Sequence, residues 1–453
     1  MKRKIIDDLI KWKDNKKHKP LLISGVRQCG KTYILKEFGN QYFEDLAYFN
    51  FDENTLLQSL FDVDFDVKRI VRELGSIFHD KEIIPNKTLV VFDEIQAFPR
   101  AISSLKYFCE NMPELHLIAA GSLLGVALKK EGISFPIGKI DRLDMYPMSF
   151  EEFVIANGGK KYIQGLNNLK INQEVPQVYK VALEKYLKDY YIVGGMPEVV
   201  ENYIENHDYN QVDRIQRNIL LDYQADFSKH TDGVTTNKIS LVWDSIPNQI
   251  AKENNKFVFS HVKSGMRSKD LEDALQWLVN AGLVYKLNLV EYPETPLSGM
   301  CDYTYFKVYM SDVGLLRNKL GLDFKTILGE CNDAPFIRFK GALTENYVLC
   351  EFKQLSIDTY FWRSNSDAEI DFITDYKGIL TPIEVKSADN TKAKSLSNFI
   401  VKYKPAKAFK VSLKNVGITL INSTNVSSLP LYLMYKFKEH YWLTTYIISR
   451  ELF

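Results

Sequence analysis

The stretch that decides the fold of the amino-terminal part is LLISGVRQCGKT, residues 21–32. It predicts a strand that ends at Gly25, then a loop, then a helix that begins near Lys31. The spacing G-x-x-x-x-G-K-T suits phosphates because backbone N–H groups at a helix N-terminus can wrap them. Lys31 would neutralise the outer phosphates and Thr32 would ligate Mg²⁺. We therefore predict a binding loop for ATP, with Mg²⁺ as its metal.

Two further apolar runs end in polar residues that such a loop needs. The run TLVVFDEIQ (88–96) places Asp93 and Glu94 at a strand end. We expect Asp93 to hold Mg²⁺ through water and Glu94 to act as general base toward the attacking water. The run HLIAAGS (116–122) ends at Ser122, which we expect to sense the nucleotide; a plain Gly-Ser turn is the alternative.

Short apolar runs alternate with helical patterns from residue 21 to residue 146, which predicts a parallel α/β sheet. The expected strands are 21–24, 46–51, 88–92, 116–120 and 137–146. The residues predicted to contact the nucleotide or its metal are Gly25, Val26, Arg27, Gln28, Cys29, Gly30, Lys31, Thr32, Tyr33, Asp93 and Ser122. Arg100 and Arg142 are the preferred candidates for an arginine finger, and a surface salt bridge is the alternative for each.

The composition is that of an ordinary globular protein. The 453 residues include 58 Lys and Arg against 57 Asp and Glu, so a nucleic-acid surface would have to be local. Five scattered cysteines form no C-x-x-C pair, which argues against a disulfide framework or a zinc site. The start lacks an apolar leader, and no stretch approaches the ~20 apolar residues of a membrane span. We expect a cytoplasmic protein without a membrane segment.

Three domains are expected, at 1–147, 148–330 and 331–453. Ser149 and Glu152 have the spacing of a capping box, so a helical region should start after Pro147. The middle region is helical in pattern, and a helix from 268 is followed by strand-like runs at 284–287 and 303–309. These elements predict a winged helix.

The third domain carries a second set of ionisable residues. Asp371 lies at the start of a strand, and Glu384 and Lys386 follow on the next strand in the run PIEVK (382–386). Two carboxylates on adjoining strands can hold Mg²⁺, and a lysine beside them can position or deprotonate water that attacks a phosphodiester. This D-(x)n-E-x-K pattern is that of the PD-(D/E)XK nuclease fold, in which Glu345 on the preceding helix would be a further acid. An ion-paired strand edge is the alternative.

Seven lysines and no acid lie between residues 391 and 414. Such a run beside a carboxylate centre suits a phosphate backbone, so DNA is a candidate partner. A solvated face that uses lysine for solubility competes evenly with this interpretation.

The runs GVRQCGKT (25–32), FDEIQ (92–96) and YPMSFEEF (146–153) resemble a prokaryotic family of AAA-type ATPases. The resemblance implies an amino-terminal AAA domain joined to a carboxy-terminal domain of unknown function with a restriction-endonuclease-like fold. We expect an ATPase that regulates or drives a nuclease-like, DNA-associated module. The alternative is a nucleotide-dependent signalling or scaffolding switch whose third domain is inert. A homo-oligomer or a protein partner is compatible with either.

Overall fold

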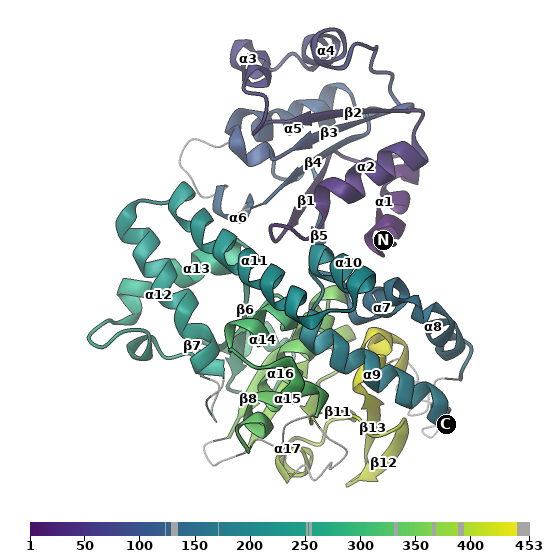
Figure 1. The fold of residues 1–453 in the computed structure, drawn as a ribbon, viewed down its shortest axis with the longest axis vertical. Coiled ribbons are helices and arrows are strands. Elements are labelled where there is room, and N and C mark those ends of the chain that lie inside the picture. Colours follow the sequence, from purple (N-terminus) through teal and green to yellow (C-terminus); the bar gives the residue numbers. More distant parts are fainter. Residues whose placement is uncertain are drawn as a thin grey trace. The chain divides into compact units, whose positions relative to one another are not determined.

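The computed structural model describes most of the chain, and every statement below refers to these residues. They are 1–122, 124–127, 135–170, 172–250, 252, 256–329, 334–364, 368–387 and 394–441. Two compact units emerge from the contacts within the chain. Unit 1 comprises Met1–Pro147 with Gln276–Leu283, and unit 2 comprises Met148–Leu275 with Val284–Phe453. Each unit is described by itself (Figure 1).

Unit 1 is built on a five-stranded parallel sheet, which confirms the predicted α/β class. Its strands are β1 (Leu21–Gly25), β2 (Asp45–Asn50), β3 (Thr88–Asp93), β4 (Leu117–Gly121) and β5 (Asp141–Met145). The order across the sheet is β2-β3-β4-β1-β5. Strand β4 therefore lies between the loop strand β1 and the acid strand β3, so the carboxyl ends of all three meet at one edge.

The buried residues of β3 show that this strand lies in the interior of the sheet, with both faces covered. All six of its residues are buried, and continuous apolar runs are typical of parallel strands covered on both faces. The helices of the unit are α1 (Ile5–Asp14), α2 (Lys31–Tyr42), α3 (Leu56–Val63), α4 (Val67–Glu73), α5 (Pro99–Asn111) and α6 (Leu124–Ala127). Helix α1 buries Ile6, Leu9 and Trp12, so the basic amino-terminal segment is a packed helix of this unit.

The first part of unit 2 is helical, as predicted. Its helices are α7 (Phe150–Val154), α8 (Lys160–Asn167), α9 (Gln177–Val193), α10 (Pro197–Asn206), α11 (Tyr209–His230) and α12 (Gly233–Ile250). The predicted capping box is present at α7, because Ser149 Oγ accepts from Glu152 N and the Glu152 carboxylate accepts from Ser149 N. Helix α13 (Ser268–Asn280) follows, and Gly282 with φ 72° lies just beyond its end.

A mixed eight-stranded sheet forms the rest of unit 2. Its strands are β6 (Val284–Val290), β7 (Cys301–Met310), β8 (Tyr360–Arg363), β9 (Glu369–Thr374), β10 (Thr381–Val385), β11 (Lys407–Ser412), β12 (Gly417–Ile421) and β13 (Thr424–Pro430). The order is β12-β13-β11-β10-β9-β8-β6-β7. The remaining helices are α14 (Val313–Lys319), α15 (Phe324–Leu328), α16 (Ala334–Gln354) and α17 (Lys394–Tyr403). Helix α17 packs on the sheet through Phe399 against Trp362, and α16 packs on it through Phe352 against Phe372.

The expected wings differ from a free two-stranded wing. Strands β6 and β7 pair with each other in antiparallel fashion, as wings would. However, Leu289 and Val290 of β6 also pair in parallel with Phe361 and Trp362 of β8. The two strands are thus the end of the large sheet, because β6 pairs with β8 on its other side while β7 forms the edge. The sheet consequently runs across residue 330.

Within the described part of the chain, none of the helices combines the length and the apolar character that crossing a bilayer requires.

Candidate functional site

The phosphate loop begins where β1 ends and closes where α2 begins. Gly25 pairs with Met145 of β5, and a Cβ on Gly25 would lie 2.2 Å from the Met145 carbonyl oxygen. Gly30 has φ 93° immediately before α2, a conformation that strongly favours glycine. Gln28 also has positive φ, at 64°. The two glycines of the motif are therefore required by a close approach and by a backbone turn, respectively.

Lys31 is the first residue of α2, and its side chain folds back into the loop. It is 6% exposed, and its Nζ donates to the carbonyl oxygens of Gly25 and Val26 at 2.9 and 3.0 Å. Cys29 Sγ lies 4.0 Å from the same ammonium. The loop thus presents the Lys31 ammonium beside the N-terminus of a twelve-residue helix, a combination that favours phosphate.

The structure brings the end of the loop together with the acid of β3. Thr32 Oγ1 donates to Asp93 Oδ2 at 2.6 Å, and Tyr48 of β2 donates to the same oxygen at 2.7 Å. Asp93 is 1% exposed. Burial, followed by the hydrogen bond to Asp93 and then the Asp93 charge, raises the pKa of the Tyr48 hydroxyl, which keeps it a hydrogen donor. A hydroxyl and a carboxylate side by side are the oxygen ligands that Mg²⁺ prefers, so these residues fit that ion.

Glu94 lies next to Asp93 in an unusual backbone conformation. Its φ of 50° is in the left-handed region, which is uncommon for a non-glycine residue and clusters at functional sites. The backbone N–H of Glu94 donates to Asp93 Oδ1 at 3.0 Å. Its carboxylate accepts hydrogen bonds from Ser122 Oγ at 3.2 Å and from Gln96 Nε2. The predicted base is therefore oriented by the residue that follows β4.

The second set of ionisable residues gathers in unit 2. Asp371 Oδ2 accepts from the backbone N–H of Val385 at 2.7 Å, which ties β9 to the end of β10. Lys386 Nζ lies 2.6 Å from Glu384 Oε1. The other carboxylate oxygen, Glu384 Oε2, is buried and accepts no hydrogen bond from the part of the chain that the structure describes. The predicted residues of this centre are thus brought together.

Two residues of β7 join this cluster, and the sequence pattern did not indicate them. The Nζ of Lys307 lies 2.5 Å from Glu369 Oε1 and 3.8 Å from Glu345 Oε2. Tyr309 donates to Glu345 Oε2 at 2.7 Å. Lys307 is 1% exposed, and its ammonium lies 4.9 Å from the centre of the Phe361 ring. We define the acid cluster as Glu345, Glu369, Asp371 and Glu384 with the lysines 307 and 386.

The pKa shifts in the acid cluster reflect crowded negative charge. Burial raises the pKa of Asp371 well above its usual value, and the charges of Glu384 and Glu345 raise it further. Burial also leaves the pKa of Glu384 raised, although Lys386 opposes this. Burial alone would lower the pKa of Lys386, but the charges of Asp371 and Glu384 outweigh it and leave that pKa raised. Such a cluster favours an added cation.

The carboxylate oxygens of the cluster determine which of its residues could hold a metal ion. Among the described residues, no three side chains of the types His, Cys, Asp and Glu converge as ligands. The orphaned Glu384 Oε2 beside Asp371 fits a cation, and Mg²⁺ is commonly bound through only one or two carboxylates. The pair Asp371 and Glu384 therefore fits the predicted ion, while Glu345 and Glu369 are already engaged by Lys307 and Tyr309.

Comparisons with known proteins agree with the fold of unit 1. Residues 17–154 match the family described as an AAA domain. The amino-terminal unit thus carries the sequence and the sheet of an AAA domain. Residues 184–326 and 340–432 match two families that are described as domains of unknown function, DUF8612 and DUF4143.

Comparisons over most of the chain find weak similarity to further proteins. An uncharacterized protein of Methanocaldococcus jannaschii is 22% identical over 366 residues, which cover 78% of this chain and 71% of that protein. A Walker-type ATPase of Pyrococcus abyssi has a TM-score of 0.43 and 16% identity, over 69% of this chain and 94% of that one. The ORC1 protein of Aeropyrum pernix, solved with DNA, has a TM-score of 0.28 and 12% identity, over 72% of this chain and 92% of that one.

Other residues of the AAA domain complete the description of the loop. Arg3 is 5% exposed and donates to the carbonyl oxygens of Cys29 at 3.1 Å and Tyr146 at 2.6 Å, so it braces the loop against the end of β5. Neither Arg3 nor Tyr48 has a sequence signal that marks it. Of the finger candidates, Arg100 donates to Phe61 O at 2.9 Å, and Arg142 lies 4.7 Å from the Phe135 ring centre.

The lysine run downstream of the acid cluster is only partly a surface. Lys394, Lys402, Lys404 and Lys414 are exposed, and Lys410, which pairs with Glu384 across β10 and β11, is half-buried. Lys407 is buried and donates to Tyr441 O at 2.9 Å. Lys392 lies outside the described residues. Four cations of the run are thus exposed to solvent, and Lys407 is a packing residue.

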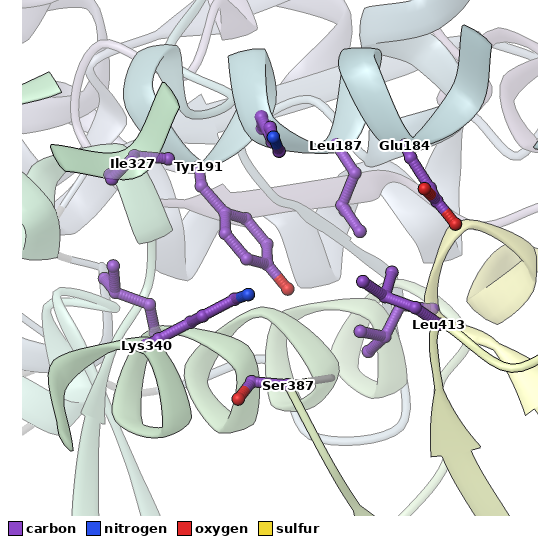
Figure 2. A pocket seen from close by; sticks show the side chains of 10 residues that line it. Glu184, Leu187, Tyr191, Ile327, Lys340, Ser387 and Leu413 are labelled. Carbon is purple, nitrogen blue, oxygen red and sulfur yellow. The ribbon is translucent and has the colours of Figure 1, made fainter. Parts of the chain in front are cut away.

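A small pocket lies in unit 2 between α9, α15, α16 and the ends of β10 and β11. Figure 2 shows Tyr191 and Lys340 pointing into it from opposite walls, with Leu187, Ile327 and Leu413 around them. Its volume is about 60 Å³, and apolar atoms form most of its lining. A space of this size holds a few water molecules, so it is no nucleotide site. None of the predicted site residues lines it.

Proposed function

We propose that this protein hydrolyses ATP with Mg²⁺ in its AAA domain, and that the ATP cycle regulates a nuclease-like centre in unit 2 that acts on DNA. The observation that carries the proposal is the contact of Thr32 with Asp93, beside Lys31 and Glu94. It supports a single site in which phosphate-binding and metal-binding groups face a candidate base.

Each residue of the AAA domain has a distinct role in this proposal. Lys31 leaves the loop carbonyls to bind the outer phosphates, and the N–H groups from Gly25 to Thr32 bind the rest. Thr32 and Asp93 hold the metal, which supplies neutralisation of charge on the transferring phosphoryl group. Glu94 accepts a proton from water, and Ser122 holds the Glu94 carboxylate in the required direction.

Two substitutions test the ATPase proposal. Lys31→Ala should lose ATP binding, because a charged hydrogen bond contributes about 1.5–3 kcal/mol, or roughly 10- to 100-fold in affinity. Glu94→Gln should bind ATP normally and lose turnover by roughly 10²- to 10⁴-fold, as expected for a general base. Calorimetry with Mg·ATP and phosphate release measure the two effects.

The control for these variants is Lys11→Ala, which removes an exposed lysine of α1. It should leave both measurements unchanged. ATP hydrolysis at the wild-type rate by both site variants would refute the assignments of Lys31 and Glu94.

The proposal for unit 2 rests on the acid cluster. Asp371 and Glu384 would hold a divalent ion, and Lys386, whose Nζ is 2.6 Å from Glu384, would position water toward a phosphodiester. The exposed lysines of the 394–414 segment would contact the phosphate backbone without reading sequence. The resemblance of the D-(x)n-E-x-K pattern to nuclease folds supports this role.

A cleavage assay tests the nuclease proposal. Wild-type protein is incubated with supercoiled or branched DNA, Mg²⁺ or Mn²⁺, and with or without ATP. We expect ATP-dependent nicking that Glu384→Gln reduces by at least ~100-fold, since the negative charge of a metal ligand is removed. Glu294→Gln, which changes an exposed glutamate of the same unit, is the matched control.

The second candidate function is a nucleotide-dependent switch with an inert carboxy-terminal part. The observation that favours it is that Lys307 and Lys386 already pair with acids of the cluster, as in a structural ion-pair network. Absence of DNA binding and of cleavage in every nucleotide state would favour this switch.

A further inference from the structure

The acid cluster divides into two pairs of carboxylates. Glu345 and Glu369 face the side chains of β7: Lys307 contacts both, and Tyr309 donates to Glu345. Asp371 and Glu384 are tied instead to the end of β10, through Val385 N and Lys386. The side chain of Glu384 is 5% exposed, and its Oε2 is unpartnered within the described residues.

The charges of the cluster define how many ions it can accept. Four carboxylates and two ammonium groups have a formal charge of −2. Uncompensated charge in a buried site is costly, and one divalent cation neutralises this site completely. A second divalent cation would leave two uncompensated positive charges. The ammonium of Lys307 also lies where a second ion would need to contact Glu345 and Glu369.

We infer that Lys307 is a built-in cation that takes the place of a second metal ion, so that the centre binds one divalent ion at Asp371 and Glu384. The inference rests on the proposed nuclease-like centre. It makes Lys307 a positioning residue, because the ammonium acts through Glu345 and Glu369.

The residues of the acid cluster come from both stretches that match domains of unknown function, 184–326 and 340–432. Lys307 and Tyr309 lie in the 184–326 match, whereas all four acids lie in the 340–432 match. Strand β7 reaches the cluster because it belongs to the same sheet as β9 and β10. The centre is therefore composite, and neither stretch alone contains it.

Counting bound ions tests the inference without an activity assay. Nucleotide-free protein is titrated with Mn²⁺, and the ions per chain are measured by calorimetry and by the loss of the free-ion electron spin resonance signal. Each chain is also measured with Asp371→Asn and Glu345→Gln added together, and the ions that this double substitution eliminates are assigned to the cluster. We expect one such ion in the wild type, one in Lys307→Arg and two in Lys307→Met.

The matched control is Lys319→Met, which removes another mostly buried lysine whose Nζ is 2.8 Å from Asp244. It should keep the wild-type count. If Lys307→Met does not fold, Glu369→Gln provides the second test: it lowers the negative charge around the ion site, so ion affinity should fall by about tenfold.

Several results would overturn the inference. The inference is wrong if the wild type binds two cluster ions, if Lys307→Met binds as many ions as the wild type, or if Glu369→Gln binds the ion with unchanged affinity. None of these results would contradict the metal centre itself. A wild-type chain with no ion that depends on Asp371 would overturn the proposed metal centre as well.

Discussion

Single buried side chains give unit 1 a dependence on pH. The rings of His18 and His116 stack with their centres 4.1 Å apart, and Trp12 meets His18 edge-on at 5.3 Å. Burial, followed by the charge of His116, lowers the pKa of His18 to about 4, although Asp141 opposes this. Burial also lowers the pKa of His116. Both rings are therefore neutral in the folded protein at pH 7.

Acid should destabilise unit 1 through these rings. An unfolded histidine takes up a proton near pH 6.5, whereas folded His18 does so only near pH 4, so the unfolded chain binds more protons in between. The stability that neutral His18 contributes is thus complete above pH 6.5 and is lost as the pH falls toward 4. We expect the thermal midpoint to drop between pH 7.5 and pH 5.0.

The variant His18→Phe should show a smaller drop, by a few degrees, since ~1 kcal/mol moves the midpoint by roughly 2–4 °C. His261→Phe, a change at an exposed histidine, should drop as the wild type does. An equal acid-induced drop in His18→Phe and wild type would contradict this explanation.

The residues of the ATP site differ in how far the sequence predicts them. Lys31 and Thr32 follow from local spacing, and the contact of Thr32 with Asp93 was expected because parallel strands end at one edge of the sheet. The contacts of Tyr48 and Lys307 could not be predicted in this way. Each reaches its partner across the sheet, so only the strand order reveals the contact.

At the scale of elements, the turn between α9 and α10 is fixed by two glycines. Gly194 has φ 73°, and a Cβ on Gly195 would lie 2.1 Å from the carbonyl oxygen of Met148. The N–H of Gly195 donates to Asp312 Oδ2 at 2.6 Å, and Asp312 also caps α14 by accepting from Leu315 N. The turn therefore joins the ends of three helices.

Gly195→Ala should destabilise unit 2 by roughly 1–3 kcal/mol, because the added methyl group displaces backbone rather than a flexible side chain. Gly299→Ala is the matched control, since a Cβ there meets nothing within 4 Å and its φ is negative. Chemical denaturation followed by circular dichroism measures both variants. Equal stability of the two would show that the turn adapts without cost.

Most elements were predicted close to their observed bounds because their apolar periodicity is strong. The strands β1 to β4 and the capping box at Ser149 belong to this group, whereas the strand expected over 137–146 is observed only as β5, Asp141–Met145. Strand β13 was missed, since its run TNVSSLP is largely polar and becomes a strand only between β11 and β12. The wings were predicted as strands, but the pairing of β6 with β8 joins residues that lie far apart in the sequence, such as Leu289 and Phe361.

At the scale of the whole molecule, two compact units follow from the contacts, and the first contains residues 1–147. The expected domain boundary at residue 330, between 148–330 and 331–453, stays a prediction. The backbone pairing of β6 with β8 crosses that position. Local composition carries no sign of such pairing, because it is set by which strand edges are left open when the chain collapses.

The continuity of this sheet constrains how genes for such chains can be rearranged. A coding fragment that stops near codon 330 would produce β6 and β7 without their neighbour, and the complementary fragment would leave the edge of β8 bare. Both products would carry an unpaired strand edge that favours self-association. We therefore expect that exchanging one stretch without the other would yield aggregating products, so that the two are best exchanged together.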